Sequence, residues 1–304
     1  MALSHDPLWP RAGSWPAVDG EADAVLLGVP TWRTSLSPTG AHATPSAIRE
    51  ALPRYGTTVL GPPIVDLDAA LRIADAGDIA EPDGDEGEAE TIACVRELSG
   101  VTRLVIALGG DNSLTYPVAL GSRATGLITF DAHFDLRDGV SNGTPVRRLV
   151  EDTPARATVD TARIDPARIV QIGIADFANS AAYARRAAEW GIRVIPLDEV
   201  RRRGAADVVA EALEIAGAGG APRVHLDIDV DVCDRAVAPG CPASVPGGLA
   251  AWELRALTRA VAADDRVVSA DLAEIDATAD AEDGRTVRLA ALCVLELLAG
   301  LASR

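Results

Sequence analysis

The segment ITFDAHFDLRD at residues 128–138 runs from apolar residues into an alternating set of acidic and imidazole side chains. Asp131, His133 and Asp135 stand two residues apart, and in an extended chain such residues point to the same face. Carboxylates that converge in this way repel each other unless a cation lies among them. We therefore predict that these side chains bind a metal ion at the end of a buried strand, rather than forming a solvated strand end.

A second acidic series, HLDIDVDVCD at residues 225–234, makes a site with two metal ions the more economical interpretation. Asp227, Asp229 and Asp231 again stand two residues apart, and the Val and Ile residues between them indicate burial rather than an acidic edge strand. Buried carboxylates without partners are very costly. An oxygen-rich set of ligands with one imidazole favours Mn²⁺, with Mg²⁺ a weaker fit and structural zinc a poor one.

Short apolar runs typical of β-strands alternate with helical patterns, which predicts an α/β fold with a parallel sheet covered on both faces. The predicted strands begin near residues 24, 63, 103, 126, 168, 193, 223 and 266, and helical stretches begin near 180, 205 and 250. No linker or repeat divides the chain, so we expect residues 1–304 to form a single domain. The acidic stretch 81–90 is predicted to be an exposed loop that leads into a helix.

Polar clusters follow four of the predicted strands. They read GGDNS at 109, DAHFD at 131, DIDVD at 227 and AEID at 273. In open parallel sheets the chemistry gathers at the carboxyl ends of the strands, so these clusters are expected to meet. The phosphate-binding patterns GxGxxG and GxxxxGK are both missing from the sequence, which argues against nucleotide binding.

The composition limits the partners and the compartment of the protein. Its net charge of −17 argues against nucleic acid or an anionic membrane as a partner, because both require a positive surface, and leaves a small-molecule substrate. The N-terminal sequence lacks the apolar region of a secretory signal. The apolar run 289–302 is too short to cross a bilayer and is expected to be a C-terminal core helix. The four cysteines form no CxxC pair, which favours free thiols in a cytoplasmic protein.

The order of GGDN, DAHFD, DxDxxD and a late Glu in DLAEID resembles the arginase/agmatinase (ureohydrolase) superfamily of binuclear manganese hydrolases. The similarity extends from GVP at residue 28 through the last predicted strand. It implies a three-layer α/β/α fold around a mostly parallel, arginase-like sheet. It also implies two Mn²⁺ ions per subunit and a homo-oligomer.

The resemblance also implies which side chains hold the two metals. Asp131 and Asp229 would bridge both ions, and Asp135 would complete the first site. The second site would be completed by His133 and Asp231. These five positions match the family pattern in both residue type and order.

Two other positions depart from the pattern of most relatives. Asn112 stands where they have a His that ligates the first metal. Its amide oxygen could act as a weaker ligand, or its side chain could cap the helix that begins near Ser113, and both interpretations stay open. In either case we expect the first metal site to be the weaker one. Asp227 occupies a position where relatives often have Ser, and it is expected to support the ligands without binding a metal.

The superfamily's activity is hydrolysis by a hydroxide that bridges the two metals and attacks an amidine or guanidine carbon. The resemblance assigns Asp135 to accept and relay the proton. It assigns Glu274 to hydrogen-bond the N–H groups of the planar substrate. We therefore expect both residues to be catalytic.

The combination of DAHFDLR with SxGTPxR, followed by GIADFANS, resembles the formimidoylglutamases of histidine degradation. Asn142 stands where arginases and agmatinases usually have a His, and Asn179 matches an Asn of the formimidoylglutamase branch. N-formimidoyl-L-glutamate carries two carboxylates, and Arg137 and Arg147 lie within the motifs nearest the metals. We expect these four residues to bind the substrate, although the two arginines could instead form ordinary surface ion pairs.

The expected reaction is hydrolysis of N-formimidoyl-L-glutamate to L-glutamate and formamide. One alternative is an amidinohydrolase that releases urea from agmatine or a guanidino acid. A less favoured one is a noncatalytic relative that has lost its metal through Asn112. Retention of the other five ligand positions and of Glu274 favours an enzyme.

Overall fold

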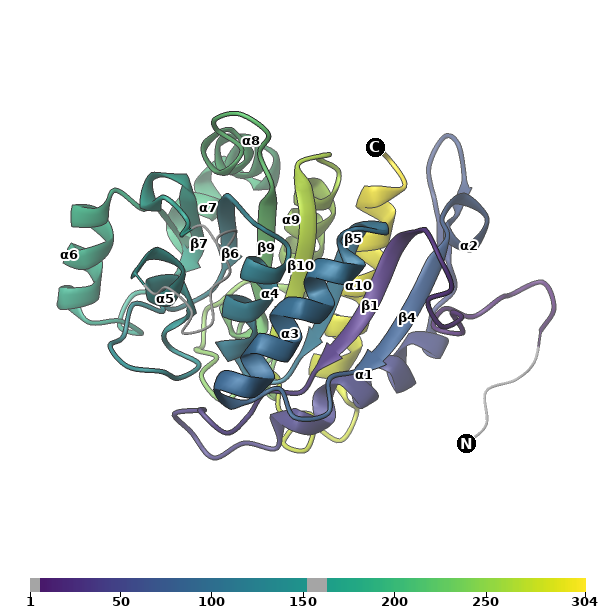
Figure 1. Cartoon of the computed structure of the whole chain (residues 1–304), viewed down its shortest axis with the longest axis horizontal. Helices are drawn as coiled ribbons and strands as arrows, with labels where there is room; N and C mark the ends of the chain where they lie inside the picture. The colour runs from purple at the N-terminus through teal and green to yellow at the C-terminus, as the bar shows by residue number, and fades with distance from the viewer. Residues whose placement is uncertain (1–5, 152–162) are drawn as a thin grey trace.

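The computed structural model describes residues 6–151 and 163–304. Its centre is an eight-stranded sheet in which every pair of neighbouring strands is parallel (Figure 1). In spatial order the strands are β4 (Ile73–Asp78), β1 (Ala22–Val29), β5 (Thr102–Gly109), β10 (Val267–Ala273), β9 (Val224–Asp229), β6 (Gly126–Phe130), β7 (Ile169–Ile174) and β8 (Arg193–Pro196). A short antiparallel pair, β2 (Thr58–Val59) and β3 (Val65–Asp66), lies outside this sheet.

Helices cover both faces of the sheet, which confirms the predicted three-layer α/β/α fold (Figure 1). One layer consists of α3 (Gly84–Leu98), α4 (Thr115–Gly121) and α5 (Pro145–Glu151), which pack in succession. The opposite layer consists of α1 (Thr44–Ala51), α10 (Arg285–Leu301), α9 (Ala251–Ala262), α8 (Ala205–Ala216) and α7 (Leu197–Arg203). At the two ends of the sheet lie α6 (Ala181–Trp190), beside β8, and the single-turn α2 (Leu67–Ala70).

Burial on both faces explains why the central strands are almost continuously apolar. Residues 104–108 of β5 and 127–130 of β6 are fully buried, as expected for parallel strands covered by helices on each side. The predicted C-terminal core helix is confirmed as α10, which begins four residues earlier than the apolar run and packs against α1 and α9. Among the described residues, we find no helix with the length and apolar character needed to cross a membrane.

Three local features differ from the predictions. The run predicted as a strand near residue 63 forms only the two-residue β3 and then α2, so it does not join the main sheet. The edge strand β4 was missed because its sequence, IADAGD, carries two Asp residues and a Gly. The acidic stretch 81–90 leads into a helix, but most of it is already helical because α3 begins at Gly84. Asp85 and Glu86 lie in the first turn, where the helix dipole stabilises negative charge.

The register of the central strands brings their carboxyl ends to one level. Phe130 of β6 is paired with Ile228 of β9, and Ala273 of β10 is paired with Asp229. The residues that follow Phe130 and Ala273, which are Asp131 and Glu274, therefore emerge at the same edge as Asp229. This alignment places three acidic positions from distant parts of the sequence together.

Candidate metal centre

The predicted ligands converge through tight turns, not through the extended chain that their alternation suggested. Strand β6 ends at Phe130, and the carboxylate of Asp131 then accepts a hydrogen bond from the N–H of His133 at 2.6 Å. In the same way Asp229, the last residue of β9, accepts one from the N–H of Asp231 at 2.9 Å. These are Asx turns, in which an Asp side chain reverses the backbone that follows it.

The turns gather the acidic side chains and one imidazole into two groups of possible metal ligands. Asp131, His133 and Asp231 form one group, and Asp131, Asp135 and Asp229 form the other. Within each group the ligand atoms lie within 4.8 Å of one another. Asp131 belongs to both groups, as a bridging ligand would, whereas Asp229 belongs to one, so bridging by Asp229 stays a prediction.

The environment of these carboxylates fits a bound cation. Burial, followed by the negative charge of Asp231, raises the pKa of Asp131 to about 6 even though His133 lowers it. Burial and the charge of Asp131 likewise raise the pKa of Asp135 well above its usual value. The Oδ2 atom of Asp131 is buried and has no hydrogen-bond partner among the described residues. A cation among these oxygens would offset both the repulsion and the cost of burial, so the donor set fits a hard divalent metal.

His133 is the most exposed member of the two ligand groups. The side chain of His133 is 26% exposed, whereas those of Asp131 and Asp231 are at most 1% exposed. The Nδ1 atom of His133 lies 2.9 Å from an oxygen of Asp231. The imidazole is therefore the part of the predicted ligand set that faces solvent.

Asn112 does not cap the helix, and its side chain has two hydrogen-bond partners within the site. The helical cap at this position is Asp111, whose carboxylate accepts from the N–H of Ser113, so the capping interpretation was wrong. The Nδ2 of Asn112 donates to Asp135 at 2.7 Å, and its Oδ1 accepts from the hydroxyl of Thr115 at 2.8 Å. Asn112 thus holds the Asp135 carboxylate through its amide N–H, and metal ligation through its amide oxygen stays a prediction.

Glu274 lies beside the ligand groups and is held by two asparagines. The Nδ2 of Asn142 lies 2.9 and 3.0 Å from its two carboxylate oxygens, and the N–H of Asn112 donates to one of them at 3.1 Å. Burial, and then the charges of Asp231 and Asp111, raise the pKa of Glu274 to about 8 despite these hydrogen bonds. Asn142, which sequence comparison singled out for substrate choice, thus contacts the predicted amidine-binding carboxylate.

A buried polar row continues beneath the metal centre. Asp227 is paired across the sheet with Asp271, and both side chains are fully buried. Asp271 lies 3.0 Å from Nε2 of His225, whose Nδ1 lies 2.8 Å from the hydroxyl of Ser269. Burial, followed by the charge of Asp271, raises the pKa of Asp227 well above its usual value. Asp227 belongs to neither ligand group, and its expected supporting role stays a prediction.

Two of the predicted substrate-binding residues have internal partners instead. The side-chain amide of Asn179 accepts from the N–H of Phe134 at 3.0 Å and donates to the carbonyl of Ala132 at 2.8 Å, so it fixes the DAHFD segment. Arg147 is mostly buried and donates to the main-chain carbonyls of Arg137 and Gly139. Their observed partners show that both residues hold the main chain around the site, and direct substrate contact by either residue stays a prediction.

Arg137 differs because it is exposed and, among the described residues, has no ion pair or side-chain hydrogen bond.

The site also includes a segment, residues 35 and 36, that was not predicted from the sequence. The N–H of Leu36 donates to Asn142 at 3.0 Å, and the hydroxyl of Ser35 donates to Asp111 at 2.6 Å. The one available signal was position, since this segment follows β1 at the same edge of the sheet.

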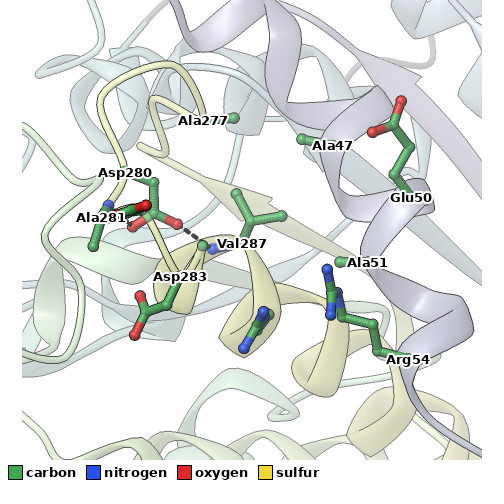
Figure 2. Close-up of a pocket in the computed structure, with 12 residues that line it drawn as sticks. Ala47, Glu50, Ala51, Arg54, Ala277, Asp280, Ala281, Asp283 and Val287 are labelled. Atoms are coloured by element: carbon green, nitrogen blue, oxygen red, sulfur yellow. Dashed lines mark hydrogen bonds between the residues drawn. The ribbon is translucent and has the colours of Figure 1, made fainter. Parts of the chain in front are cut away.

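A separate pocket of about 350 Å³ lies between α1, α10 and the loop before α10 (Figure 2). It is lined by acidic and basic side chains together, including Glu50, Arg54 and Asp283. None of the predicted metal ligands contributes to it. We therefore assign the chemistry to the carboxyl edge of the sheet and not to this pocket.

Comparison with known proteins identifies the family of this chain. The family model described as the arginase family matches residues 22–300. The chain belongs to this family, which confirms the resemblance inferred from its motifs.

Several formimidoylglutamases are similar to this chain over nearly its whole length. A formimidoylglutamase of Halobacterium salinarum is 36% identical over 301 residues, which cover 94% of this chain and 90% of that relative. The crystal structure of formimidoylglutamase from Bacillus subtilis matches with a TM-score of 0.86 and 29% identity, covering 99% of this chain and 94% of that one. A Trypanosoma cruzi formiminoglutamase determined with Mn²⁺ matches with a TM-score of 0.84 and 25% identity, covering 97% of this chain and 99% of that one.

Proposed function

We propose that this protein is a metal-dependent hydrolase that converts N-formimidoyl-L-glutamate and water to L-glutamate and formamide. The observation that carries the proposal is the pair of ligand groups sharing Asp131, next to a buried Glu274 held by Asn142. These features lie in a chain that is similar over nearly its whole length to formimidoylglutamases. The reaction cleaves a C–N bond of a linear amidine.

The proposed metal is Mn²⁺, with two ions per subunit. Its presence in the related Trypanosoma cruzi structure and the oxygen-rich ligand set both support this choice. When bound, the ions supply activation of water at neutral pH. The site formed by Asp131, Asp135 and Asp229 would be the weaker one, because Asn112 offers a neutral amide where most relatives have an imidazole.

The chain's own residues orient the substrate and move the proton. The carboxylate of Glu274 would accept hydrogen bonds from the amidine N–H groups, and Asn142 holds that carboxylate through a contact with both of its oxygens. Asp135 accepts the proton of the attacking water and relays it to the departing amine of glutamate. The hydrogen bond from Asn112 keeps the Asp135 carboxylate oriented for this role.

Substrate choice is proposed to depend on Arg137. A guanidinium group with no carboxylate partner among the described residues suits one of the two carboxylates of formimidoylglutamate. Agmatine has no carboxylate and would gain nothing from this group. The proposal therefore favours a dianionic amidine over a cationic guanidine.

A substrate panel with added Mn²⁺, with products identified chemically, tests the proposed function. We expect formamide and glutamate from formimidoylglutamate, little urea from agmatine or arginine, and no turnover by the Asp229→Ala variant. Urea from agmatine or arginine without formamide from formimidoylglutamate would overturn the substrate assignment. The absence of product from every amidine and guanidine, with manganese bound, would favour a noncatalytic role.

We further propose that the protein is a homo-oligomer in the cytoplasm, with no nucleic acid or membrane partner. The net charge of −17 and four cysteines that are all free thiols support this environment. Light scattering on the purified protein would test the oligomeric state, and cell fractionation would test the compartment.

A further inference from the structure

Arg137 lies at the edge of the candidate metal centre, and its side chain runs across Gly143. A Cβ atom added at Gly143 would lie 2.7 Å from Cδ of Arg137. Gly143 directly follows Asn142, which contacts both oxygens of Glu274. The side chain of Arg137 therefore lies against the segment that carries Asn142, the residue that contacts Glu274.

The segment that carries Arg137 is held through its main-chain carbonyls by two other arginines. Arg186, on α6, donates to the carbonyl of Leu136 at 2.6 Å. Arg147, on α5, donates through Nε to the carbonyl of Arg137 at 2.8 Å and through Nη2 to that of Gly139 at 2.6 Å. Both helices lie toward the β8 end of the sheet (Figure 1). Residues 136–139 belong to no helix or strand, so the two guanidinium groups replace the hydrogen bonds of a regular element.

The two holding arginines also have carboxylate partners of their own. Arg147 lies 3.1 Å from Glu151, and Arg186 lies 2.9 Å from Asp138. Their charges are thus balanced within the framework. Arg137, which has no carboxylate partner among residues 6–151 and 163–304, is left as the cation of this segment that can attract an anionic ligand.

We propose that Arg147 and Arg186 are positioning residues that hold Arg137 in place for a substrate carboxylate. This inference rests on the proposed function, and it replaces the expectation that Arg147 itself contacts the substrate. A segment ordered before the substrate arrives loses less conformational entropy on binding, so loosening the segment weakens substrate binding. The arginines therefore act on substrate affinity through Arg137.

Steady-state kinetics of Arg147→Met and Arg186→Met would test the inference, with Arg185→Met as a matched control. Arg185 is the exposed neighbour of Arg186 on the same helix. We expect KM for formimidoylglutamate to rise about tenfold in the first two variants, with kcat and manganese content kept. Turnover of N-propylformamidine, which has the amidine without carboxylates, should not change. Arg147→Lys, which keeps one donor, should recover part of the loss.

A double-mutant cycle with Arg137→Met separates positioning from a general structural role. If Arg147 and Arg186 act through Arg137, their substitution should change KM little once Arg137 is gone. Additive losses, or equal losses on both amidines, would overturn the inference. An unfolded Arg147→Met leaves Arg186→Met to decide the same question. Failure of the wild-type protein to hydrolyse formimidoylglutamate would instead contradict the proposed function, so the two failures are distinguishable.

Discussion

Replacing Asn142 with Ala would release the Glu274 carboxylate on one side. The Nδ2 of Asn142 lies 2.9 and 3.0 Å from the two oxygens, and the N–H of Asn112 at 3.1 Å would remain as a donor. A hydrogen bond to a charged group contributes about 1.5–3 kcal/mol, so kcat/KM for formimidoylglutamate should fall roughly ten- to a hundredfold. A loss of orientation would lower kcat, whereas a loss of amidine binding in the ground state would raise KM.

The assay is formamide release at several substrate concentrations, with the manganese content measured on the same samples. Asn142→Asp is the matched variant, because it keeps the shape of the side chain but replaces the donor with a carboxylate that repels Glu274. It should lose more activity than Asn142→Ala, while both keep their manganese because Asn142 is in neither ligand group. Equal activity in the wild type and both variants would refute the role given to the contact with Glu274.

Three further predictions concern the metals and the substrate pocket. Asp131→Ala and Asp229→Ala should each lose manganese, and unchanged metal content in both variants would contradict the proposed centre. Chelation of the metal should lower the melting temperature of the wild type, because the repulsion between the carboxylates returns. Asn112→His should tighten manganese binding in a titration, and unchanged affinity and stoichiometry would favour a structural role for Asn112. Gly143→Ala should raise KM roughly three- to tenfold with little change in kcat, because the Cβ of the alanine would displace the Arg137 side chain. If the Gly143→Ala variant has the same kinetics as the wild type, Arg137 is not needed at its observed position.

The chemistry of the site could be predicted from residue type and spacing, but its conformation could not. Asp131, His133 and Asp135 do converge, yet the alternation that identified them implied an extended chain. The structure uses Asx turns instead, and Asp135 has a positive φ of 52°. The prediction held because a strand end and a tight turn both bring side chains two residues apart to one side.

The spacing of residues along the sequence does not reveal contacts between distant segments. Asn142 and Glu274 lie 132 positions apart, and Leu36 reaches Asn142 across 106. Charge and position near a motif suggested the same role for Arg137 and Arg147, but only their surroundings distinguish an exposed guanidinium from one that binds main-chain carbonyls. The number and type of hydrogen-bond acceptors around a side chain depend on tertiary packing, which local sequence does not encode.

Asp135 and Glu274 share a strained backbone conformation that matters for protein engineering. Both have left-handed φ angles, 52° and 60°, which cost a non-glycine residue about 1–3 kcal/mol. Both also carry carboxylates in a crowded, acidic site, so in the metal-free protein glycine at either position would relieve strain and repulsion at once. A selection for thermostability without added metal should therefore enrich inactive variants at these two positions. Directed evolution of this enzyme would need activity as a selection criterion in every round.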